Sequence, residues 1–223
     1  MTKIFFQGIF GAYSHLASLS IDSNAEIIPC KTFDECFLRA LKDENSKIVI
    51  PESNRITGNI GIEYLIFKYR LNIYSEHFQK IEHNLLGIPG AKINEIKDVY
   101  SHAQALSQCS KFISDNKFNE HVRADTAGSA EMISKNNNKH QAAIASTLSA
   151  EKYGLKIIKK NIENENGNLT RFLVMGKKIL QPELSSKKYI TSFLFKLKSK
   201  PAALYQSLAG FAINGVNLTK LQS

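Results

Sequence analysis

Short apolar runs along the chain are each followed by a polar turn and then by a segment with helical spacing. The first run covers residues 3–7, and a helix is expected over residues 15–19 after a glycine-containing turn. The next apolar run, residues 47–50, is expected to stop at Pro51, because proline lacks the N–H that a central strand donates. A polar loop then precedes a helix near residues 60–69. This alternation predicts an α/β fold with parallel sheets.

The same order recurs three times between residues 99 and 154. Helices are expected over residues 103–113, from Ala127 onward, and over residues 147–153, where Gly154 ends the last one. Ligands of such sheets bind at the carboxyl ends of the strands, where helix N-termini favour an anion. The polar residues at these turns are candidates for a carboxylate site: Ser14, Asn54, Ser101, Gln104, Thr126, Ser146 and Thr147. The alternative for each residue alone is a plain helix cap, the role expected of Ser14 in the first helix.

A hydroxyl and a guanidinium stand side by side where an acidic, Asn-rich loop gives way to an apolar run at residues 168–172. A polar loop followed by a short apolar run predicts a loop that enters a buried strand. Because neighbouring side chains of a strand point to opposite faces, Thr170 and Arg171 are expected to have different partners.

The last part of the chain predicts the beginning of a second domain. Residues 177–188 have the composition of a linker. A strand is expected over residues 189–197, a helix over 202–212 that Gly215 closes, and a further strand from Val216. About 35 residues in this order cannot bury a core alone, so we expect the chain to stop inside that domain.

Composition and charge narrow the class of protein. The 223 residues carry a formal net charge of +9, which favours anionic partners, but the lysines are spread along the chain and no nucleic-acid-binding motif is present. No apolar run approaches a membrane span and no signal peptide is evident, so we expect a cytoplasmic protein that binds neither nucleic acid nor membrane. The three cysteines have no paired spacing and are expected to be reduced and mostly buried.

No standard catalytic apparatus stands out in the sequence. Metal-ligand spacing, a nucleophile elbow and paired carboxylates are all missing, and we expect neither a metal nor a cofactor. His102 is the imidazole at one of the candidate turns, where a hydrogen-bonded turn residue is the expected role.

Five motifs, in order along the chain, resemble those of the prephenate dehydratase family. Residues 8–17 resemble the opening Gly-x-x-Gly-x-Tyr/Phe-Ser-His-x-Ala, and residues 101–106 resemble Ser-His-Pro-Gln-Ala-Leu. Residues 125–130 and 142–155 resemble the two following helix entries, and residues 168–172 resemble Asn-x-Thr-Arg-Phe. The resemblance covers essentially the whole chain.

The resemblance implies a domain organisation. Residues 1–178 would form a catalytic domain of two α/β lobes with a central cleft, of the periplasmic-binding-protein kind. A linker over residues 179–188 would lead to the incomplete start of a ferredoxin-like ACT domain over residues 189–223. The residues that would contact L-phenylalanine, the feedback effector of the full-length protein, are Ala202, Ala203, Leu204, Asn217 and Leu218. The family also implies a homo-oligomer.

The resemblance also assigns roles to site residues. Thr170 occupies the position of the family's catalytic threonine, and Ser101, Gln104 and Asn54 are expected to support it. The residues expected to bind the substrate are Arg171, Phe172, Ser14, Gln108, Thr126, Ala127, Asn168 and Arg55.

Residues 51–55 depart from the family pattern Pro-x-Glu-Asn-Ser. Asn54 keeps its place, whereas Ser53 stands at the glutamate position and Arg55 at the serine position. Glu52 comes one residue early, which on a regular extended segment would turn its side chain to the opposite face.

The reaction implied is the decarboxylating dehydration of prephenate to phenylpyruvate, water and CO2 in L-phenylalanine biosynthesis. We expect helix N-termini and either Arg171 or Arg55 to hold the pyruvyl carboxylate, since a guanidinium binds a carboxylate in bidentate geometry. Thr170 would donate a hydrogen bond to the leaving hydroxyl. Two alternatives remain open, an arogenate dehydratase and a non-catalytic carboxylate-binding protein of the same fold.

Overall fold

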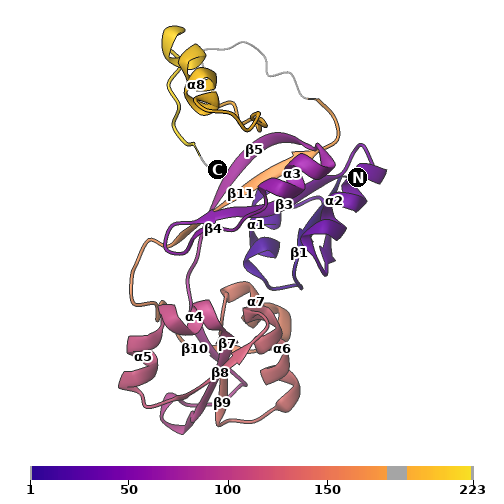
Figure 1. Ribbon diagram of the computed structural model, residues 1–223. Helices are drawn as coiled ribbons and strands as arrows, with labels where there is room; N and C mark the ends of the chain where they lie inside the picture. The colour runs from indigo at the N-terminus through magenta and orange to yellow at the C-terminus, as the bar shows by residue number, and fades with distance from the viewer. Residues whose placement is uncertain (1, 180–189, 222–223) are drawn as a thin grey trace. The chain divides into compact units, whose positions relative to one another are not determined.

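The computed structural model describes residues 2–179 and 190–221 (Figure 1). Two compact units are present, residues 1–184 and residues 185–223. The first unit contains two β-sheets, each with its own helices, and we call these parts lobe 1 and lobe 2. Lobe 1 consists of residues 2–80 and 169–179, and lobe 2 consists of residues 84–159.

The lobe 1 sheet has the strand order β2-β1-β3-β11-β5, and β4 pairs with β3 outside this path. Strand β1 runs parallel to β2 and β3, whereas β11 runs antiparallel to both β3 and β5. The strands are β1 (Lys3–Gln7), β2 (Glu26–Cys30), β3 (Lys47–Asn54), β4 (Gly58–Asn59), β5 (Asn72–Lys80) and β11 (Leu169–Gly176).

Helices cover both faces of this sheet, which explains why its central strands are continuously apolar. Helix α1 (Tyr13–Ile21) packs on the face that carries Ile4, Val49, Phe172 and Val174. The other helices of lobe 1 are α2 (Phe33–Lys42) and α3 (Glu63–Tyr69). They pack on the opposite face, with Phe5, Ile48, Ile50, Leu173 and Met175. The alternation along β11 therefore sends residues 170, 172 and 174 toward the α1 side.

The lobe 2 sheet has the strand order β10-β6-β9-β7-β8. Strand β7 is parallel to β8 and β9, while β6 is antiparallel to β9 and β10. The strands are β6 (Asn84–Gly87), β7 (Asp98–His102), β8 (Asn119–Arg123), β9 (Gln141–Ala145) and β10 (Lys156–Lys159). The helices are α4 (Ala103–Gln108), α5 (Ser110–Asp115), α6 (Thr126–Asn136) and α7 (Thr147–Tyr153), with a 3-10 turn η1 (Ile93–Glu95).

Two chain segments join the lobes, residues 81–83 and residues 160–168. They are hydrogen-bonded to each other, from Ile81 N to the Asn168 carbonyl at 2.9 Å and from Ile162 N to the His83 carbonyl at 2.9 Å. The segments therefore form one paired connection, which we call the crossover.

The lobes also meet where the loop after β1 contacts helix α7. The hydroxyls of Ser146 and Ser149 donate to the Gly11 carbonyl at 2.7 and 2.9 Å, and the Tyr153 hydroxyl donates to the Phe10 carbonyl at 2.7 Å. Gly11 has φ +93°, and a Cβ there would lie 2.9 Å from Ser149 Oγ. A glycine is therefore needed at this contact.

The βα units expected from the sequence are present, but β3 does not stop at Pro51. It continues to Asn54, and Pro51 pairs with Phe172 of β11. Strand β1 pairs with β3 only as far as Val49. On that side of β3, no residue of β1 therefore needs a hydrogen bond from a backbone N–H at Pro51. The expected end of the strand was wrong for this reason.

The helix expected over residues 103–113 is broken into α4 and α5. Cys109, at the break, has φ −114° and ψ 13° and is not helical. The Asn164 side chain accepts a hydrogen bond from Lys111 N at 3.0 Å, which satisfies an amide in the first turn of α5. A residue of the crossover thus supports the new helix start.

The second unit contains helix α8 (Ala203–Ile213), within one residue of the expected helix, and Gly215 follows it with φ +65°. The strand expected over residues 189–197 is not formed over its described residues, 190–197, and none is formed over 216–220. Strands need hydrogen-bonding partners, and a lone strand–helix start does not provide them. The expected linker lies outside the described residues apart from Ile179, and the domain boundaries stay predictions.

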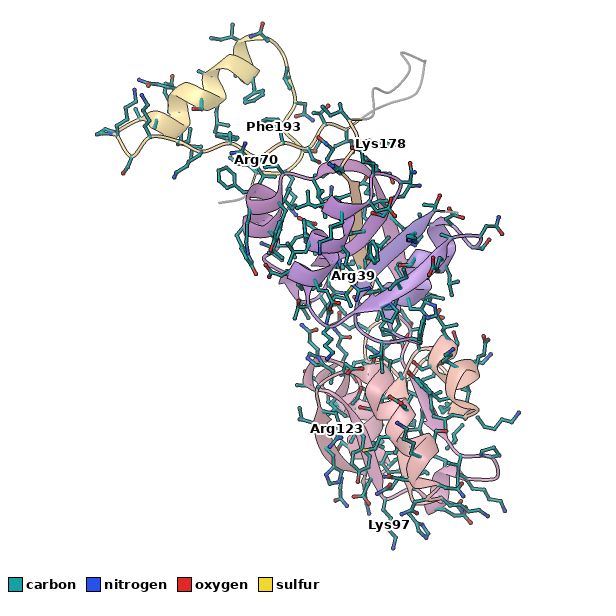
Figure 2. All side chains as sticks on the ribbon, turned by 90° about the vertical axis from the view of Figure 1, so that its right-hand side faces the viewer. Arg39, Arg70, Lys97, Arg123, Lys178 and Phe193 are labelled. Atoms are coloured by element: carbon teal, nitrogen blue, oxygen red, sulfur yellow. The ribbon has the colours of Figure 1, made fainter. Side chains whose placement is uncertain are left out.

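Exposed basic side chains occur on several elements of both lobes. Arg39 and Arg70 belong to lobe 1, and Lys97 and Arg123 belong to lobe 2 (Figure 2).

All three cysteines are buried free thiols, as expected. In the part of the chain that the structure describes, no helix has the length and apolar character to cross a membrane.

Candidate active site

Thr170, the second residue of β11, is the centre of a buried polar site. It pairs in register with Asn54 of β3 on one side and with Gln79 of β5 on the other. The Nδ2 of Asn54 donates a hydrogen bond to Thr170 Oγ1 at 2.8 Å, and only 7% of Thr170 is exposed. Because Oγ1 is the acceptor in this bond, the threonine keeps its own proton for another partner.

The orientation of the Asn54 amide is fixed by the turn that follows β3. Its Oδ1 accepts from the backbone N–H groups of Ile56 at 3.0 Å and Thr57 at 3.1 Å. A backbone N–H can only donate, so this end of the amide is the oxygen and the other end is the NH2 group. That NH2 group donates both to Thr170 and to Asn168 Oδ1, the latter at 2.8 Å.

The polar contacts continue from Thr170 across the crossover into lobe 2. Asn168 Nδ2 donates to Gln108 Oε1 at 3.2 Å, and the same oxygen lies 2.8 Å from His83 Nε2. Gln108 belongs to α4 of lobe 2, and His83 and Asn168 lie in the crossover. We call the connected set of Thr170, Asn54, Asn168, Gln108, His83 and Tyr13 the Thr170 network.

Tyr13, at the start of α1, completes the Thr170 network. Its hydroxyl lies 3.0 Å from His83 Nδ1 and 2.7 Å from the Glu82 carbonyl. Burial lowers the pKa of His83, although the hydrogen bond to Gln108 and the charge of Glu163 act the other way. Burial also raises the pKa of Tyr13 well above its ordinary value. Both side chains are therefore neutral groups near pH 7.

Neither Tyr13 nor His83 was predicted from the sequence as a site residue. Tyr13 lies inside the first motif, between Gly11 and Ser14. His83 belongs to the polar triplet of residues 82–84, which separates two apolar-containing strands. That polar triplet was the signal available in the sequence, since polar side chains on a segment that joins two lobes can contact both lobes.

Arg171 has other partners than Thr170, as expected from strand alternation. Its Nε donates to Glu76 Oε2 at 2.7 Å and its Nη1 donates to Glu52 Oε2 at 3.0 Å. Burial alone would lower the pKa of Arg171, but hydrogen bonds and charge from Glu76 and Glu52 raise it. Two of the guanidinium's N–H groups are thus held by carboxylates, and the structure does not bring Arg171 into the Thr170 network.

A β-bulge explains the position of Glu52. Arg171 pairs with Ser53 and Phe172 pairs with Pro51, so Glu52 is the extra residue on β3. Its carboxylate accepts from the Ser53 hydroxyl at 2.6 Å and also reaches Arg171. The expectation that Glu52 turns away from Ser53 was wrong, because the bulge interrupts the regular alternation of faces.

Arg55 lies directly after Asn54 and is exposed. Its Nη1 donates to the Gly167 carbonyl at 3.3 Å, and its backbone N–H donates to the Leu169 carbonyl at 2.8 Å. Within residues 2–179 and 190–221, Arg55 makes no ion pair. Its charge is therefore available beside the strand that carries Thr170.

The structure does not bring the candidates at the β7–α4 turn into contact with Thr170. Ser101 is fully buried, and its hydroxyl donates to the Ile144 carbonyl at 2.6 Å. The Gln104 side chain is exposed, while its backbone N–H donates to His102 Nδ1 at 3.3 Å. His102 is thus the N-cap of α4, which confirms it as a turn residue.

Helix α6 does not present an open anion site. The Asp125 carboxylate caps it by accepting from Gly128 N at 2.6 Å, so a negative charge already occupies this helix start. Thr126 follows as the first helical residue, and Ala127 is fully buried. The structure thus gives neither side chain a role at an anion site.

The N-termini of α7 and α1 differ from each other. Ser146 caps α7 and contacts lobe 1 through Gly11, and Thr147 follows it as the first helical residue. Helix α1 has Ala12 as its N-cap, so the expected capping role of Ser14 was wrong. Instead, His15 Nδ1 accepts from Gly11 N at 3.0 Å, which fixes the loop before α1.

Phe172 is a core residue of lobe 1 rather than part of the polar site. It is 1% exposed and packs with Ile4, Ala17 and Val49 beneath helix α1. The structure therefore gives Phe172 a packing role next to Thr170.

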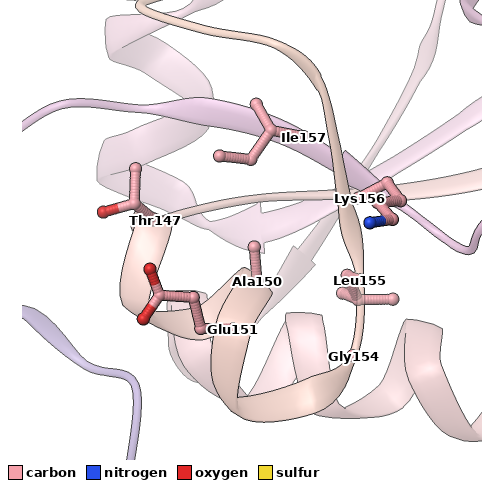
Figure 3. Close-up of a pocket in the computed structure, with 7 residues that line it drawn as sticks. All are labelled: Thr147, Ala150, Glu151, Gly154, Leu155, Lys156 and Ile157. Carbon is pink, nitrogen blue, oxygen red and sulfur yellow. The ribbon is translucent and has the colours of Figure 1, made fainter.

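A cavity of about 420 Å³ lies between α7 and β10 in lobe 2 (Figure 3). Its lining residues are Thr147, Ala150, Glu151, Gly154, Leu155, Lys156 and Ile157. It includes no member of the Thr170 network, so the cavity and the polar site are separate features. Among the described residues, no group of three or more His, Cys, Asp or Glu side chains is arranged to hold a metal ion.

Comparison with known proteins bears on the identity of this fold and site. The model of the family described as prephenate dehydratase matches residues 4–179. Arogenate dehydratase/prephenate dehydratase 1, chloroplastic, of Arabidopsis thaliana is 37% identical over 222 residues, covering 99% of this chain and 56% of that protein. The chain therefore spans about half the length of this relative.

Two further proteins agree with this match. The bifunctional N-acyl-homoserine lactone acylase/prephenate dehydratase of Komagataeibacter europaeus is 35% identical over 222 residues, covering 99% of this chain and 79% of that protein. The crystal structure of prephenate dehydratase from Staphylococcus aureus subsp. aureus Mu50 is similar with a TM-score of 0.76 and 27% identity, covering 99% of this chain and 82% of that one. The two-lobed α/β fold is thereby confirmed. The chain belongs to the prephenate dehydratase family.

Proposed function

We propose that the chain catalyses the decarboxylating dehydration of prephenate to phenylpyruvate in L-phenylalanine biosynthesis. In this reaction the bond between the ring and its carboxylate breaks, and its electron pair enters the ring. The bond between the ring and the hydroxyl oxygen breaks as well, and the hydroxide takes up a proton. The products are phenylpyruvate, CO2 and water, and the gain of an aromatic ring drives the reaction forward.

The observation that carries the proposal is the bond from Asn54 Nδ2 to Thr170 Oγ1. A threonine hydroxyl has one proton, and an incoming donor on its oxygen directs that proton to a further acceptor. The leaving hydroxyl of prephenate is such an acceptor. A donor placed where negative charge develops lowers the barrier for departure.

Arg55 is the better candidate to hold the pyruvyl carboxylate. The expectation left open Arg171 or Arg55, and Arg171 already binds Glu52 and Glu76. Arg55 is exposed, next to Asn54, and without an ion pair in the described ranges. A guanidinium that is free of carboxylates binds an anionic substrate without first breaking another ion pair.

The ring carboxylate, which leaves as CO2, is best held weakly. A strong cation beside it would stabilise the ground state more than the transition state and slow the reaction. The Thr170 network contains amides, hydroxyls and a neutral imidazole, and these are hydrogen-bonding groups without net charge. This composition supports the proposed chemistry.

The test is formation of phenylpyruvate from prephenate by the purified chain. Turnover that depends on Thr170 is the expected result. Tight binding of prephenate without turnover would replace the proposal with a non-catalytic binding protein of the same fold. The control is a Thr170→Ala variant whose folded state is checked by circular dichroism.

A second candidate substrate is arogenate, which has an amine where prephenate has a keto group. The Arabidopsis relative is named for both substrates, which favours measuring both. The amine of arogenate would bind more tightly if a carboxylate near the pyruvyl position were available to pair with it. The carboxylates of Glu52 and Glu76 are instead paired with Arg171, which supports prephenate as the substrate. A comparison of kcat/KM for the two substrates decides, and a higher value for arogenate would contradict the prephenate assignment.

We also propose that the full-length protein responds to L-phenylalanine and works as a cytoplasmic homo-oligomer. The support for phenylalanine is the resemblance of residues 189–223 to the start of an ACT domain, with Ala202, Ala203 and Leu204 at the beginning of α8. Addition of L-phenylalanine to the full-length enzyme should lower its turnover, and light scattering should give the mass of a multimer.

A further inference from the structure

The direction of each hydrogen bond in the Thr170 network can be derived from its lobe 1 end. Asn54 Oδ1 accepts from the backbone N–H groups of Ile56 and Thr57, so Asn54 Nδ2 is a donor. Asn168 Oδ1 accepts from it, so Asn168 presents its NH2 group to Gln108. Each amide has only one acceptor end and one donor end, so one assignment fixes the next.

Gln108 links His83 to this chain of hydrogen bonds. The Gln108 oxygen that accepts from Asn168 Nδ2 at 3.2 Å also lies 2.8 Å from His83 Nε2. An amide oxygen cannot donate, so His83 must carry a proton on Nε2. Two backbone N–H groups after β3 therefore determine which nitrogen of a histidine in the crossover is protonated.

The other side of the His83 ring faces the Tyr13 hydroxyl. The ring is buried and neutral, so with its proton on Nε2 it presents Nδ1 as an acceptor. The Tyr13 hydroxyl lies 3.0 Å from Nδ1, but it donates its one proton to the Glu82 carbonyl at 2.7 Å, so the Gln108 side of the ring alone assigns the proton on Nε2. The network then runs from Tyr13 of lobe 1, through the crossover and lobe 2, and back to Thr170.

We infer that His83 is a positioning residue for Thr170, because it keeps Gln108 Oε1 turned toward Asn168 and thereby keeps Asn168 Oδ1 as the acceptor beside the Asn54 amide that donates to Thr170. This inference rests on the proposed function, because it assigns His83 to the support of the proposed catalytic threonine. His83 does not touch the reacting atoms in this role. It acts through the orientation of the Gln108 and Asn168 amides.

The burial of the ring explains why its loss would matter. His83 is 3% exposed and Asn168 is 3% exposed, so water does not readily replace a lost donor at Gln108. Without the His83 donor, Gln108 can rotate and present its NH2 group to Asn168, which opposes the donor already there. Such a conflict is relieved by breaking the contact between Gln108 and Asn168 or by turning the Asn168 amide, which then no longer accepts from Asn54.

The test compares three substitutions of His83. His83→Gln can place an amide N–H near the Nε2 position, whereas His83→Asn mimics the Nδ1 side and leaves Gln108 without a donor. His83→Leu removes both nitrogens. The matched control is His121→Gln, because His121 is a partly exposed histidine of β8 that pairs with Asp98. Initial rates with prephenate give kcat and KM for each protein.

We expect kcat to fall roughly 10-fold or more in His83→Leu and His83→Asn, with KM within about twofold of wild type. His83→Gln should recover most of the loss, and His121→Gln should match wild type. Equal kcat values for His83→Asn and His83→Gln would overturn the inference, since a merely structural ring would not distinguish them. The comparison of His83→Asn with His83→Gln also tests the inference if His83→Leu does not fold.

A second measurement reads the proton on His83 without using turnover. Nitrogen-15 chemical shifts of labelled histidine distinguish the two neutral tautomers, and His83→Gln identifies the signal by its loss. A protonated Nε2 with an unprotonated Nδ1 supports the inference, and the reverse tautomer overturns it. If wild type does not turn over prephenate, the proposed function fails, and the tautomer still decides whether the network has the derived direction.

Discussion

Asn54 donates to Thr170 across the pairing of β3 and β11, with 2.8 Å between Nδ2 and Oγ1. The two residues are 116 positions apart in the chain, and the fold places them opposite each other in one sheet. The bond assigns the threonine oxygen as an acceptor and directs its proton to a further partner. The Thr170 proton is therefore left for a further acceptor, the role that the proposed function gives to the substrate.

Replacement of Thr170 by alanine removes that donor. We expect kcat for phenylpyruvate formation to fall roughly 100-fold or more, as for other lost transition-state donors. Thr170→Ser keeps the hydroxyl and should retain far more activity than Thr170→Ala. Turnover of Thr170→Ala within about threefold of wild type would rule out the catalytic role.

Asn54→Asp tests the direction of the same bond with almost no change in shape. An aspartate can still accept from Ile56 N and Thr57 N, but it cannot donate to Thr170. We expect at least a roughly 10-fold loss of kcat in a variant that still folds by circular dichroism, with a lower unfolding temperature because the donor to Asn168 Oδ1 is lost as well. Asn116→Asp, at an exposed position in lobe 2, is the matched control. Equal activities of the two variants would contradict the assigned direction.

Arg171 holds two glutamates, and its replacement should lower stability. Glu52 is 9% exposed in its side chain, so Arg171→Met leaves a nearly buried carboxylate without this cation. We expect the free energy of unfolding to fall by about 1–3 kcal/mol, because a nearly buried carboxylate that loses a bound cation is costly. Addition of Glu52→Gln should restore part of the loss in urea denaturation, and purely additive effects would argue against a direct pair.

The buried His15 should make stability depend on pH. Burial lowers the pKa of His15 from 6.5, and the charge of Lys152 lowers it further. The ring also stacks on Phe6, and its Nδ1 accepts from Gly11 N. The unfolded chain therefore binds a proton at higher pH than the folded chain does, and acid favours unfolding.

We expect the free energy of unfolding to decrease as the pH falls below about 6.5, with a slope of up to about 1.4 kcal/mol per pH unit for one proton. His15→Gln should flatten this part of the curve. His140→Gln, an exposed histidine, serves as the control and should keep the slope of wild type. Chemical denaturation at several pH values measures the effect, and identical slopes for all three proteins would refute it.

The sequence predicted the parts of the fold that depend on local pattern. The βα units of both lobes follow from apolar runs and turns, as at β1 and α1. Strand β5 was missed, because it is an edge strand with many polar and exposed residues. The antiparallel placement of β11 was also missed, since the partners of a strand are set by the whole sheet and not by its own residues.

The candidate site was predicted in part for a similar physical reason. Thr170, Asn54, Asn168 and Gln108 come together as a network, whereas Ser101 bonds a backbone carbonyl in lobe 2. A hydroxyl at a helix entry can be satisfied locally, and the sequence does not distinguish this from contact with a ligand. His83 joins the network through residues 25 and 70 positions away, which no local motif encodes.

The crossover also has a topological meaning. Strands β5 and β11 are antiparallel neighbours, and Lys80 at the end of one pairs with Leu169 at the start of the other. They are the two arms of a β-hairpin whose connecting loop has been replaced by all of lobe 2. Lobe 2 is thus an insertion into lobe 1, and a short turn could close the hairpin if that insertion were removed. The boundary of that insertion, where Lys80 pairs with Leu169, adjoins Thr170.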